Sequence, residues 1–238
     1  MKYPIRSAMP ALACLLLTAC ITNYEFPRTY ESERLAAGNR FAAVSIVSSE
    51  LTCARIPTLA FNNEIRTGTA GFDVSATIKT AFAEVFEEVS NGTRVLAQAD
   101  AGRLAAIYTP GNVFYPIDYR NVRDYVAELM QFEDLDYLAL YVGSNDPDFI
   151  GDTRHRLDDI GCYTRGDSDP LYRYIAAEML LFHKDEDRPI AQAFIREYEE
   201  TGLEGSMIER FLTNSEQQKA TETFVAQAID TSARLLFK

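Results

Sequence analysis

The chain has 238 residues, of which 47% are hydrophobic and 24% are charged, and its formal net charge at pH 7 is −12. These proportions are typical of a globular domain and argue against a largely disordered chain. An acidic surface repels phosphate backbones, so the charge excludes nucleic acid as an expected partner.

The first twenty residues, MKYPIRSAMPALACLLLTAC, have the layout of an export signal. Lys2 and Arg6 form a positive start, and residues 8–17 form an apolar run. A run of this length is too short to cross a hydrocarbon core of roughly 30 Å as a helix. The pattern therefore predicts a cleaved signal and not a membrane-spanning segment.

The apolar run ends in Leu17-Thr18-Ala19-Cys20. This motif resembles the lipobox of bacterial lipoproteins, and the resemblance implies cleavage before Cys20, attachment of diacylglycerol to Cys20 and acylation of its new N-terminus. Several acyl chains anchor firmly, because each buried methylene contributes about 0.8 kcal/mol. The next residue is Ile21 and not Asp, which by the enterobacterial sorting rule implies the outer membrane, with the chain facing the periplasm. The alternative is a secreted protein whose signal happens to contain a cysteine.

The chain accordingly divides into a signal peptide (1–19), a lipidated N-terminus and tether (20–40) and a single α/β domain (41–238). The tether is polar and irregular, and twenty residues reach at most roughly 70 Å. Without its signal the chain carries 21 basic and 35 acidic residues, a net charge of −14. Such a surface disfavours adsorption on anionic lipid, so we expect membrane attachment through the lipid at Cys20.

The first half of the domain alternates strand and helix patterns. Residues 41–47 form a short apolar run typical of a buried strand. After a loop at 48–72, Asp73 is the expected N-cap of a helix that ends at Asn91-Gly92. Residues 93–99 are the second expected strand. The helix is predicted by apolar residues at helical spacing, namely Val74, Ile78, Phe82, Val85 and Val89.

A second helix is expected after Asp118, and a third strand at 137–142. This β-α-β-α-β order predicts three parallel strands joined by crossover helices. A polar loop follows at 143–170.

The last part of the chain has a different pattern. Strands at 171–183 and 190–198 are joined by a short connection, which predicts an antiparallel hairpin. Ser215-Glu216-Gln217-Gln218 resembles a capping box and opens a final helix. The expected fold is α/β, a mixed sheet with three parallel strands, an antiparallel hairpin and a C-terminal helix. The order of elements loosely resembles the small α/β domains of envelope lipoproteins and translocation factors.

Two cysteines remain once the signal is removed and Cys20 is lipidated. The periplasm is oxidising, so Cys53 and Cys162 are expected to form one structural disulfide. Both follow expected parallel strands, whose carboxyl ends meet at one edge of the sheet. Two separate buried thiols are the alternative.

The remaining motifs carry weaker chemistry. The acids Asp146, Asp148, Asp152, Asp158 and Asp159 suggest either calcium binding or a solvated loop, and they lack the EF-hand order of ligands. The only histidines, His155 and His183, are expected at the rim or surface, and no metal or cofactor is predicted. An aromatic stretch suggests either protein recognition or cover for the core, and it contains Tyr108, Phe114, Tyr115 and Tyr119.

These observations lead to a hypothesis of function. We expect a non-enzymatic, lipid-anchored accessory protein of the cell envelope that binds another periplasmic or outer-membrane protein through loops around 48–72, 101–117 and 143–170. One alternative is an envelope hydrolase, which requires a cleft with several acids of raised pKa. Another is a ligand-binding lipoprotein, which requires a large apolar pocket.

Overall fold

The structure is a computed structural model that describes residues 29–31, 35, 38–56, 64–108, 120–143 and 159–237. The expected signal and Cys20 lie outside the described residues. The strands are β1 (Arg40–Ser45), β2 (Glu50–Arg55), β3 (Glu64–Thr69), β4 (Thr93–Arg94), β5 (Tyr137–Gly143), β6 (Asp159–Thr164), β7 (Pro170–His183) and β8 (Ala191–Glu204). The helices are α1 (Val74–Ser90), α2 (Ala101–Ile107), α3 (Arg120–Phe132), α4 (Ile208–Thr213) and α5 (Ser215–Leu236), with a 3-10 turn η2 (Gly205–Met207) before α4.

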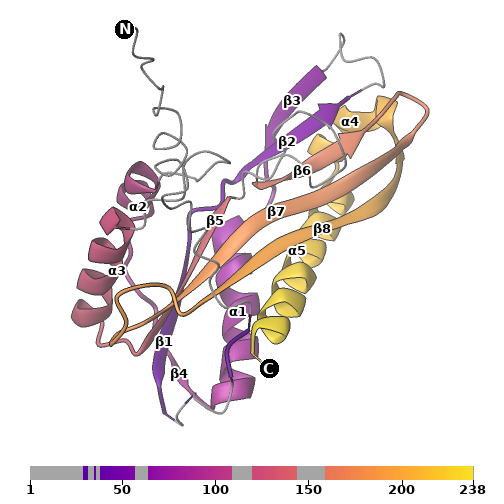
Figure 1. Ribbon diagram of the computed structural model, residues 1–238. Helices are drawn as coiled ribbons and strands as arrows, with labels where there is room; N and C mark the ends of the chain where they lie inside the picture. The colour runs from indigo at the N-terminus through magenta and orange to yellow at the C-terminus, as the bar shows by residue number, and fades with distance from the viewer. Residues whose placement is uncertain are drawn as a thin grey trace, which may run out of the picture.

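All the described strands belong to one mixed sheet in which β7 is the central strand (Figure 1). One edge of β7 pairs with β8 along almost its whole length. The opposite edge pairs with β6 at Tyr172–Ala176 and with β5 at Ala177–His183, both antiparallel. The sheet therefore divides into two branches, β5-β1-β4 and β6-β2-β3, that share β7.

The expected fold class is confirmed. Strand β1 lies between β4 and β5 and is parallel to both, which makes the three parallel strands. Strands β7 and β8 form the antiparallel hairpin, and α5 is the C-terminal helix. A third parallel pair, β2 with β6, lies outside the three predicted parallel strands.

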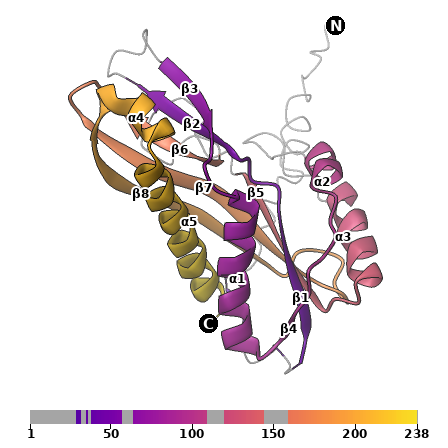
Figure 2. The ribbon, with the colours of Figure 1, turned by 180° about the vertical axis from the view of Figure 1, so that it is seen from behind.

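Helices cover the sheet on both faces, with α1 and α5 on one side and α2 and α3 on the other (Figure 2). Side chains of alternate strand residues point to the same face of the sheet. The larger core lies between one of these faces and the helices α1 and α5. Its fully buried rings include Phe41, Phe82, Phe86 and Tyr141. The ring of Phe82 alone contacts those of Phe41, Phe86, Tyr141 and Phe237 at centroid separations of 5.7–6.4 Å.

The other face of the sheet carries two smaller cores. One lies under α2 and α3 and includes Leu104, Val126, Leu140 and Leu180. The other comes from the β6-β2 branch and β7 alone, without a described helix, and its members are Ala54, Ile56, Tyr163, Tyr174 and Ala176, with Tyr172 packed against them.

Local capping explains where the long helices begin and end. Asp73 caps α1 as predicted, since its side chain accepts a hydrogen bond of 2.9 Å from the Ala76 N–H. Asn91 ends α1 in the left-handed conformation with φ 48°, also as predicted. The predicted capping box at Ser215 is wrong. Asn214 caps α5 instead, because its side chain accepts from the N–H groups of Glu216 and Gln217.

Two expected loops contain strands. The segment 48–72 holds the β2-β3 hairpin, and the segment 143–170 holds β6. Strand β3 reads EIRTGT and lacks an apolar alternation, because it is an exposed edge strand whose main support is hydrogen bonding to β2. These segments are therefore strands because they pair with partners distant in sequence, and not because of the pattern of apolar residues within them.

The segment 93–108 also differs from the expectation of a strand over 93–99. Only Thr93–Arg94 pair as β4, and one further hydrogen bond joins the Val95 N–H to the Phe41 carbonyl. The Gln98 N–H is instead bonded to the Glu133 carboxylate. Helix α2 then begins after Asp100, whose side chain accepts from the Arg103 N–H.

Two boundaries shift. Helix α3 is described from Arg120, so the expected cap Asp118 lies outside the described residues. Strand β8 continues to Glu204, beyond the expected end at residue 198. Its last residues are mostly polar, and a strand at the edge of a sheet can contain them because their side chains stay in solvent.

The aromatic cluster around Phe82 generates a prediction. Phe82→Ala removes a fully buried ring that touches four others, so the free energy of unfolding in urea should fall by about 3–5 kcal/mol. Phe132→Ala is the matched control, since that ring is exposed, and it should change stability by less than about 0.5 kcal/mol. Equal effects of the two substitutions would contradict the assigned core.

Candidate functional site

Cys53 and Cys162 form a disulfide, as predicted. The two residues lie directly opposite each other in the parallel pair of β2 and β6, with Cα atoms 4.3 Å apart, and both are fully buried in the core beneath α1 and α5. The bond joins positions 109 residues apart in sequence. It therefore holds together the β6-β2-β3 branch, which has fewer described helices against it than the rest of the sheet.

The middle of the sheet contains a junction between β5 and β6. Gly143, the last residue of β5, lies opposite Ala177, and Asp159, the first residue of β6, lies opposite Ala176. Residues 144–158, which are outside the described residues, thus join two consecutive positions along β7. Asp159 has a positive φ of 60°, and a Cβ at Gly143 would overlap its carboxylate. A side chain at the end of β5 would therefore require the Asp159 carboxylate to move aside.

Beside this junction lies Glu178, a carboxylate in the middle of the apolar strand β7. It faces the side of the sheet that α3 covers, opposite Val142 of β5 and Phe194 of β8, and is only 4% exposed. The Gln192 side-chain amide donates a hydrogen bond to its carboxylate. A buried acid with a single described hydrogen-bond donor is costly to ionise.

The electrostatics of this group follow from its burial. Burial raises the pKa of Glu178 to about 7, although the bond from Gln192 and the charge of Arg196 favour the ionised form. Burial also raises the pKa of Tyr108, and the negative charges of Glu178 and Asp159 raise it further. The Tyr108 hydroxyl therefore lies within electrostatic reach of both Glu178 and Asp159. A carboxyl group with a pKa near neutrality can exchange a proton at physiological pH.

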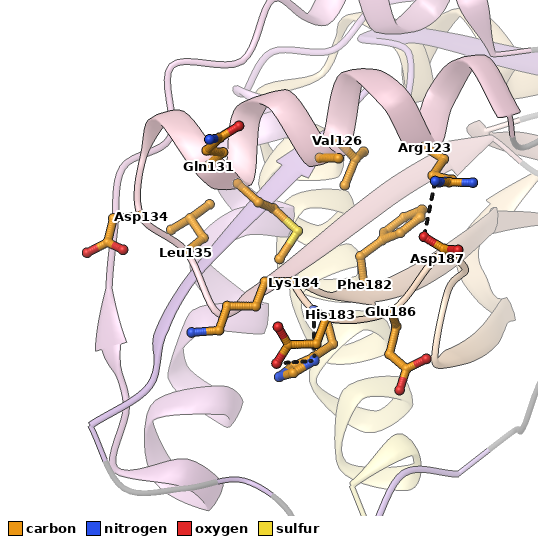
Figure 3. A pocket seen from close by; sticks show the side chains of 13 residues that line it. Arg123, Val126, Gln131, Asp134, Leu135, Phe182, His183, Lys184, Glu186 and Asp187 are labelled. Carbon is orange, nitrogen blue, oxygen red and sulfur yellow. Dashed lines mark hydrogen bonds and ion pairs between the residues drawn. The ribbon is translucent and has the colours of Figure 1, made fainter.

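The second candidate site is a cleft of about 440 Å³ between α3 and the turn that joins β7 to β8. Figure 3 shows Val126, Leu135 and Phe182 pointing into the space between the helix and the turn, whereas Asp134 points away from it. Its rim is polar and mostly charged, and it includes Arg123, Gln131, Lys184, Asp185, Glu186 and Asp187.

Ion pairs hold the two sides of this cleft. Arg123 of α3 lies 3.1 Å from Asp187 of the turn, so the pair bridges the cleft (Figure 3). Lys184 lies 2.6 Å from Asp136, which precedes β5, and this pair lowers the pKa of Asp136. The cleft therefore combines a small apolar floor with a rim of charges of both signs, an arrangement suited to polar side chains of a partner.

His183 borders the cleft at the end of β7. Its Nδ1 accepts a hydrogen bond of 3.3 Å from the Asp185 N–H, and its ring packs on Tyr137 with centroids 4.8 Å apart. His155 lies outside the described residues. Within the described ranges, no group of three or more His, Cys, Asp or Glu side chains is arranged to hold a metal ion.

The structure describes one residue from each of two residue clusters that the sequence analysis singled out. Of the aromatic stretch it describes Tyr108, and of the five clustered acids it describes Asp159. The others, Phe114, Tyr115, Tyr119, Asp146, Asp148, Asp152 and Asp158, lie outside the described residues. Sequence reasoning missed Glu178 as a site residue. The signal was present, because Glu178 is the one carboxylate inside the apolar run of residues 174–182.

None of the described helices combines the length and the apolar composition that crossing a bilayer requires.

Comparisons with known proteins do not identify a family. No protein-family model matches the chain, and no curated protein matches it. Among solved structures, the chain is similar to the hypothetical protein CT253 from Chlamydia trachomatis, with a TM-score of 0.34 and 8% sequence identity, over 83% of this chain and 98% of that one. A similarity at this level carries no argument about function.

The disulfide generates a prediction about stability. The double substitution Cys53→Ser and Cys162→Ser frees two strands that are distant in sequence, so the free energy of unfolding should fall by about 2–5 kcal/mol. Urea titrations followed by circular dichroism measure the loss. A reducing agent should lower the stability of the unsubstituted protein by a similar amount and leave the double variant unchanged. If the reductant has no effect on either protein, the bond does not contribute.

Glu178 generates a prediction about pH. Its pKa in the folded chain, about 7, exceeds its ordinary value of 4.5, so the folded state binds the proton more tightly than the unfolded state. This contribution to stability is complete below pH 4.5 and is lost as the pH rises through 7. Glu178→Gln should therefore be more stable than the unsubstituted protein at pH 8, by up to about 3 kcal/mol.

Urea titrations at several pH values between 4 and 8 measure this effect. The exposed Glu200→Gln on β8 is the control, and its stability difference from the unsubstituted protein should not change with pH in the same way. A Glu178→Gln variant that is less stable at pH 8 would show that the ionised carboxylate is well compensated.

Proposed function

We propose that this protein is a lipid-anchored accessory protein of the cell envelope, attached at Cys20 to the outer membrane and facing the periplasm, where it binds another envelope protein without catalysing a reaction. The lipobox-like Leu17-Thr18-Ala19-Cys20 supports the anchor, and Ile21 supports the outer membrane as its address.

The observation that carries this proposal is the disulfide between Cys53 and Cys162. Cytosolic thiols are kept reduced, whereas disulfides persist in the periplasm and other oxidising compartments. A buried disulfide therefore favours an exported chain, independently of the first twenty residues. Two unrelated parts of the chain thus support the same compartment.

The surface of the domain supports attachment through lipid and recognition of a protein. With a net charge of −14 after removal of residues 1–19, the chain is not drawn to anionic lipid by its own surface. The cleft beside α3 offers charged groups around a small apolar floor, and protein interfaces combine such features. Its volume suits one or two side chains of a partner.

The two alternatives have narrower support. Glu178, with its raised pKa, favours a carboxylate enzyme, but it is one acid and does not line the cleft beside α3. The cleft volume of about 440 Å³ falls within the range of small-ligand sites. Its charged rim differs from the apolar lining that a pocket for an apolar ligand requires.

The test is crosslinking in living cells followed by affinity capture of the full-length chain and of a Cys20→Ala variant. We expect the unsubstituted chain in the outer-membrane fraction, crosslinked to one discrete envelope protein, and the variant to be released from the membrane with most of that crosslink lost. Capture of only abundant outer-membrane proteins by both forms would overturn the accessory function. Membrane retention of Cys20→Ala would overturn the lipid anchor.

A further inference from the structure

The N-terminal tether joins the folded domain at a defined place, the C-terminal end of α5. The Tyr30 N–H donates a hydrogen bond of 2.6 Å to the Leu236 carbonyl, and Tyr30 forms a β-bridge with Phe237. The Tyr30 ring stands edge-on to Tyr137 at 6.2 Å, and the two hydroxyl oxygens are 3.4 Å apart. Phe237 in turn packs on Phe86 at 5.4 Å, so this contact is continuous with the main core.

This attachment limits the distance between the domain and the lipid. Nine residues, 21–29, separate Cys20 from Tyr30. A fully extended chain spans at most about 3.3–3.6 Å per residue, so Tyr30 lies within about 35 Å of the lipidated cysteine. Strand β7 alone is 14 residues long, which corresponds to about 45 Å. The stretch between Cys20 and Tyr30 is therefore shorter than the domain, although the whole tether of residues 20–40 would be longer, and it brings one end of the domain to the membrane.

That end, called the tether end, comprises the last turns of α1, α3 and α5, strand β4 and the β7-β8 turn, which lie together in the lower part of Figures 1 and 2. Side-chain bonds connect these elements. Glu133, after α3, accepts from the Gln98 N–H beyond β4, and Arg234 of α5 lies 2.8 Å from Glu88 of α1. Lys184 of the turn pairs with Asp136 before β5.

Large apolar side chains are exposed at this end. Among the described residues, the two most exposed large hydrophobic side chains are Phe132 at the end of α3, 81% exposed, and Leu96 after β4, 79% exposed. Leu235 in the last turn of α5 is 54% exposed. Single exposed apolar residues are ordinary. Three at the end to which the lipid tether attaches favour contact with a membrane interface, because apolar side chains gain free energy when they leave water for the headgroup region.

The charges at the tether end indicate which lipid headgroups it can contact. Several of its cations pair with acids: Arg123 with Asp187, Lys184 with Asp136, and Arg234 with Glu88. The turn at residues 184–190 carries three acids against the two cations Lys184 and Arg188. An end with excess acid is repelled by anionic headgroups, so contact with lipid depends on the apolar side chains and suits zwitterionic headgroups.

We propose that the tether end rests on the lipid surface in which Cys20 is anchored, with Phe132, Leu96 and Leu235 at the headgroup level. This proposal rests on the lipid anchor proposed above. The opposite end, with the β2-β3 hairpin, the β6-β7 turn and α4, then points away from the membrane, about 45 Å farther into the periplasm.

The absence of tryptophan from the chain makes a direct test available. The full-length lipidated protein is purified as two variants, Phe132→Trp at the tether end and Ile65→Trp on β3 at the opposite end. Ile65 is the matched control because it is 56% exposed. Each variant is reconstituted with phosphatidylcholine–phosphatidylethanolamine vesicles containing brominated phosphatidylcholine, and tryptophan emission is compared with that in unbrominated vesicles.

We expect brominated lipid to quench the Phe132→Trp emission by about twofold or more and to leave Ile65→Trp unchanged, since only the first side chain reaches the interface. Unchanged unfolding midpoints establish that both variants are folded. Equal emission changes in the two variants, or no change in Phe132→Trp, would overturn the proposed orientation.

Flotation of the same vesicles separates this proposal from the one it rests on. Flotation of the lipidated chain together with loss of flotation in Cys20→Ala supports the anchor. If the chain floats and Phe132→Trp is not quenched, the anchor stands and the orientation is wrong. If the chain does not float, the lipid anchor fails and the orientation fails with it.

Discussion

The pairing of β7 with three other strands is the constraint on which the rest of the structure depends. This strand is buried along nearly its whole length, and it pairs with β8 on one edge and with both β5 and β6 on the other. Its odd-numbered residues, such as Ile175 and Met179, enter the core under α1 and α5, and its even-numbered residues, such as Leu180 and Phe182, enter the core under α3. Both cores therefore form only when β7 is in register with its neighbours.

The same strand explains why the candidate sites lie where they do. The edge that β5 and β6 share places their junction at mid-sheet, next to Glu178, the one carboxylate that β7 carries into the interior. The end of β7 leads into the turn that faces α3, which forms the cleft with Arg123 and Lys184 on its rim. On the β6-β2-β3 branch the buried disulfide links Cys53 and Cys162. These three features lie at different points along the 14-residue strand β7. The cleft is at its end, Glu178 is near its middle, and the disulfide is on the branch that pairs with its first half.

The N-terminal segment contacts the domain at one end of β7. Tyr30 is held by the backbone of Leu236 and the ring of Tyr137, so the chain leaves the domain at one end and not from its side. In the proposed arrangement the charged cleft lies near the membrane, and the disulfide-linked branch extends away from it. A partner that reaches the cleft would then be one whose contacting segment lies close to the lipid surface, whereas a periplasmic partner would meet the opposite end.

Patterns within single segments predicted the three parallel strands, the hairpin, the C-terminal helix and the ends of α1, because caps and apolar periods act over a few residues. The address predicted from residues 1–20 stays a prediction. Pairing between distant segments decided the rest. It made strands of β3 and β6, which lack a strong local pattern, and it shortened β4 when the chain turned toward α3. It also decided that Glu178, the one acid within an apolar run, is buried. The physical reason is that hydrogen bonding and burial in a sheet depend on neighbours that local sequence does not contain.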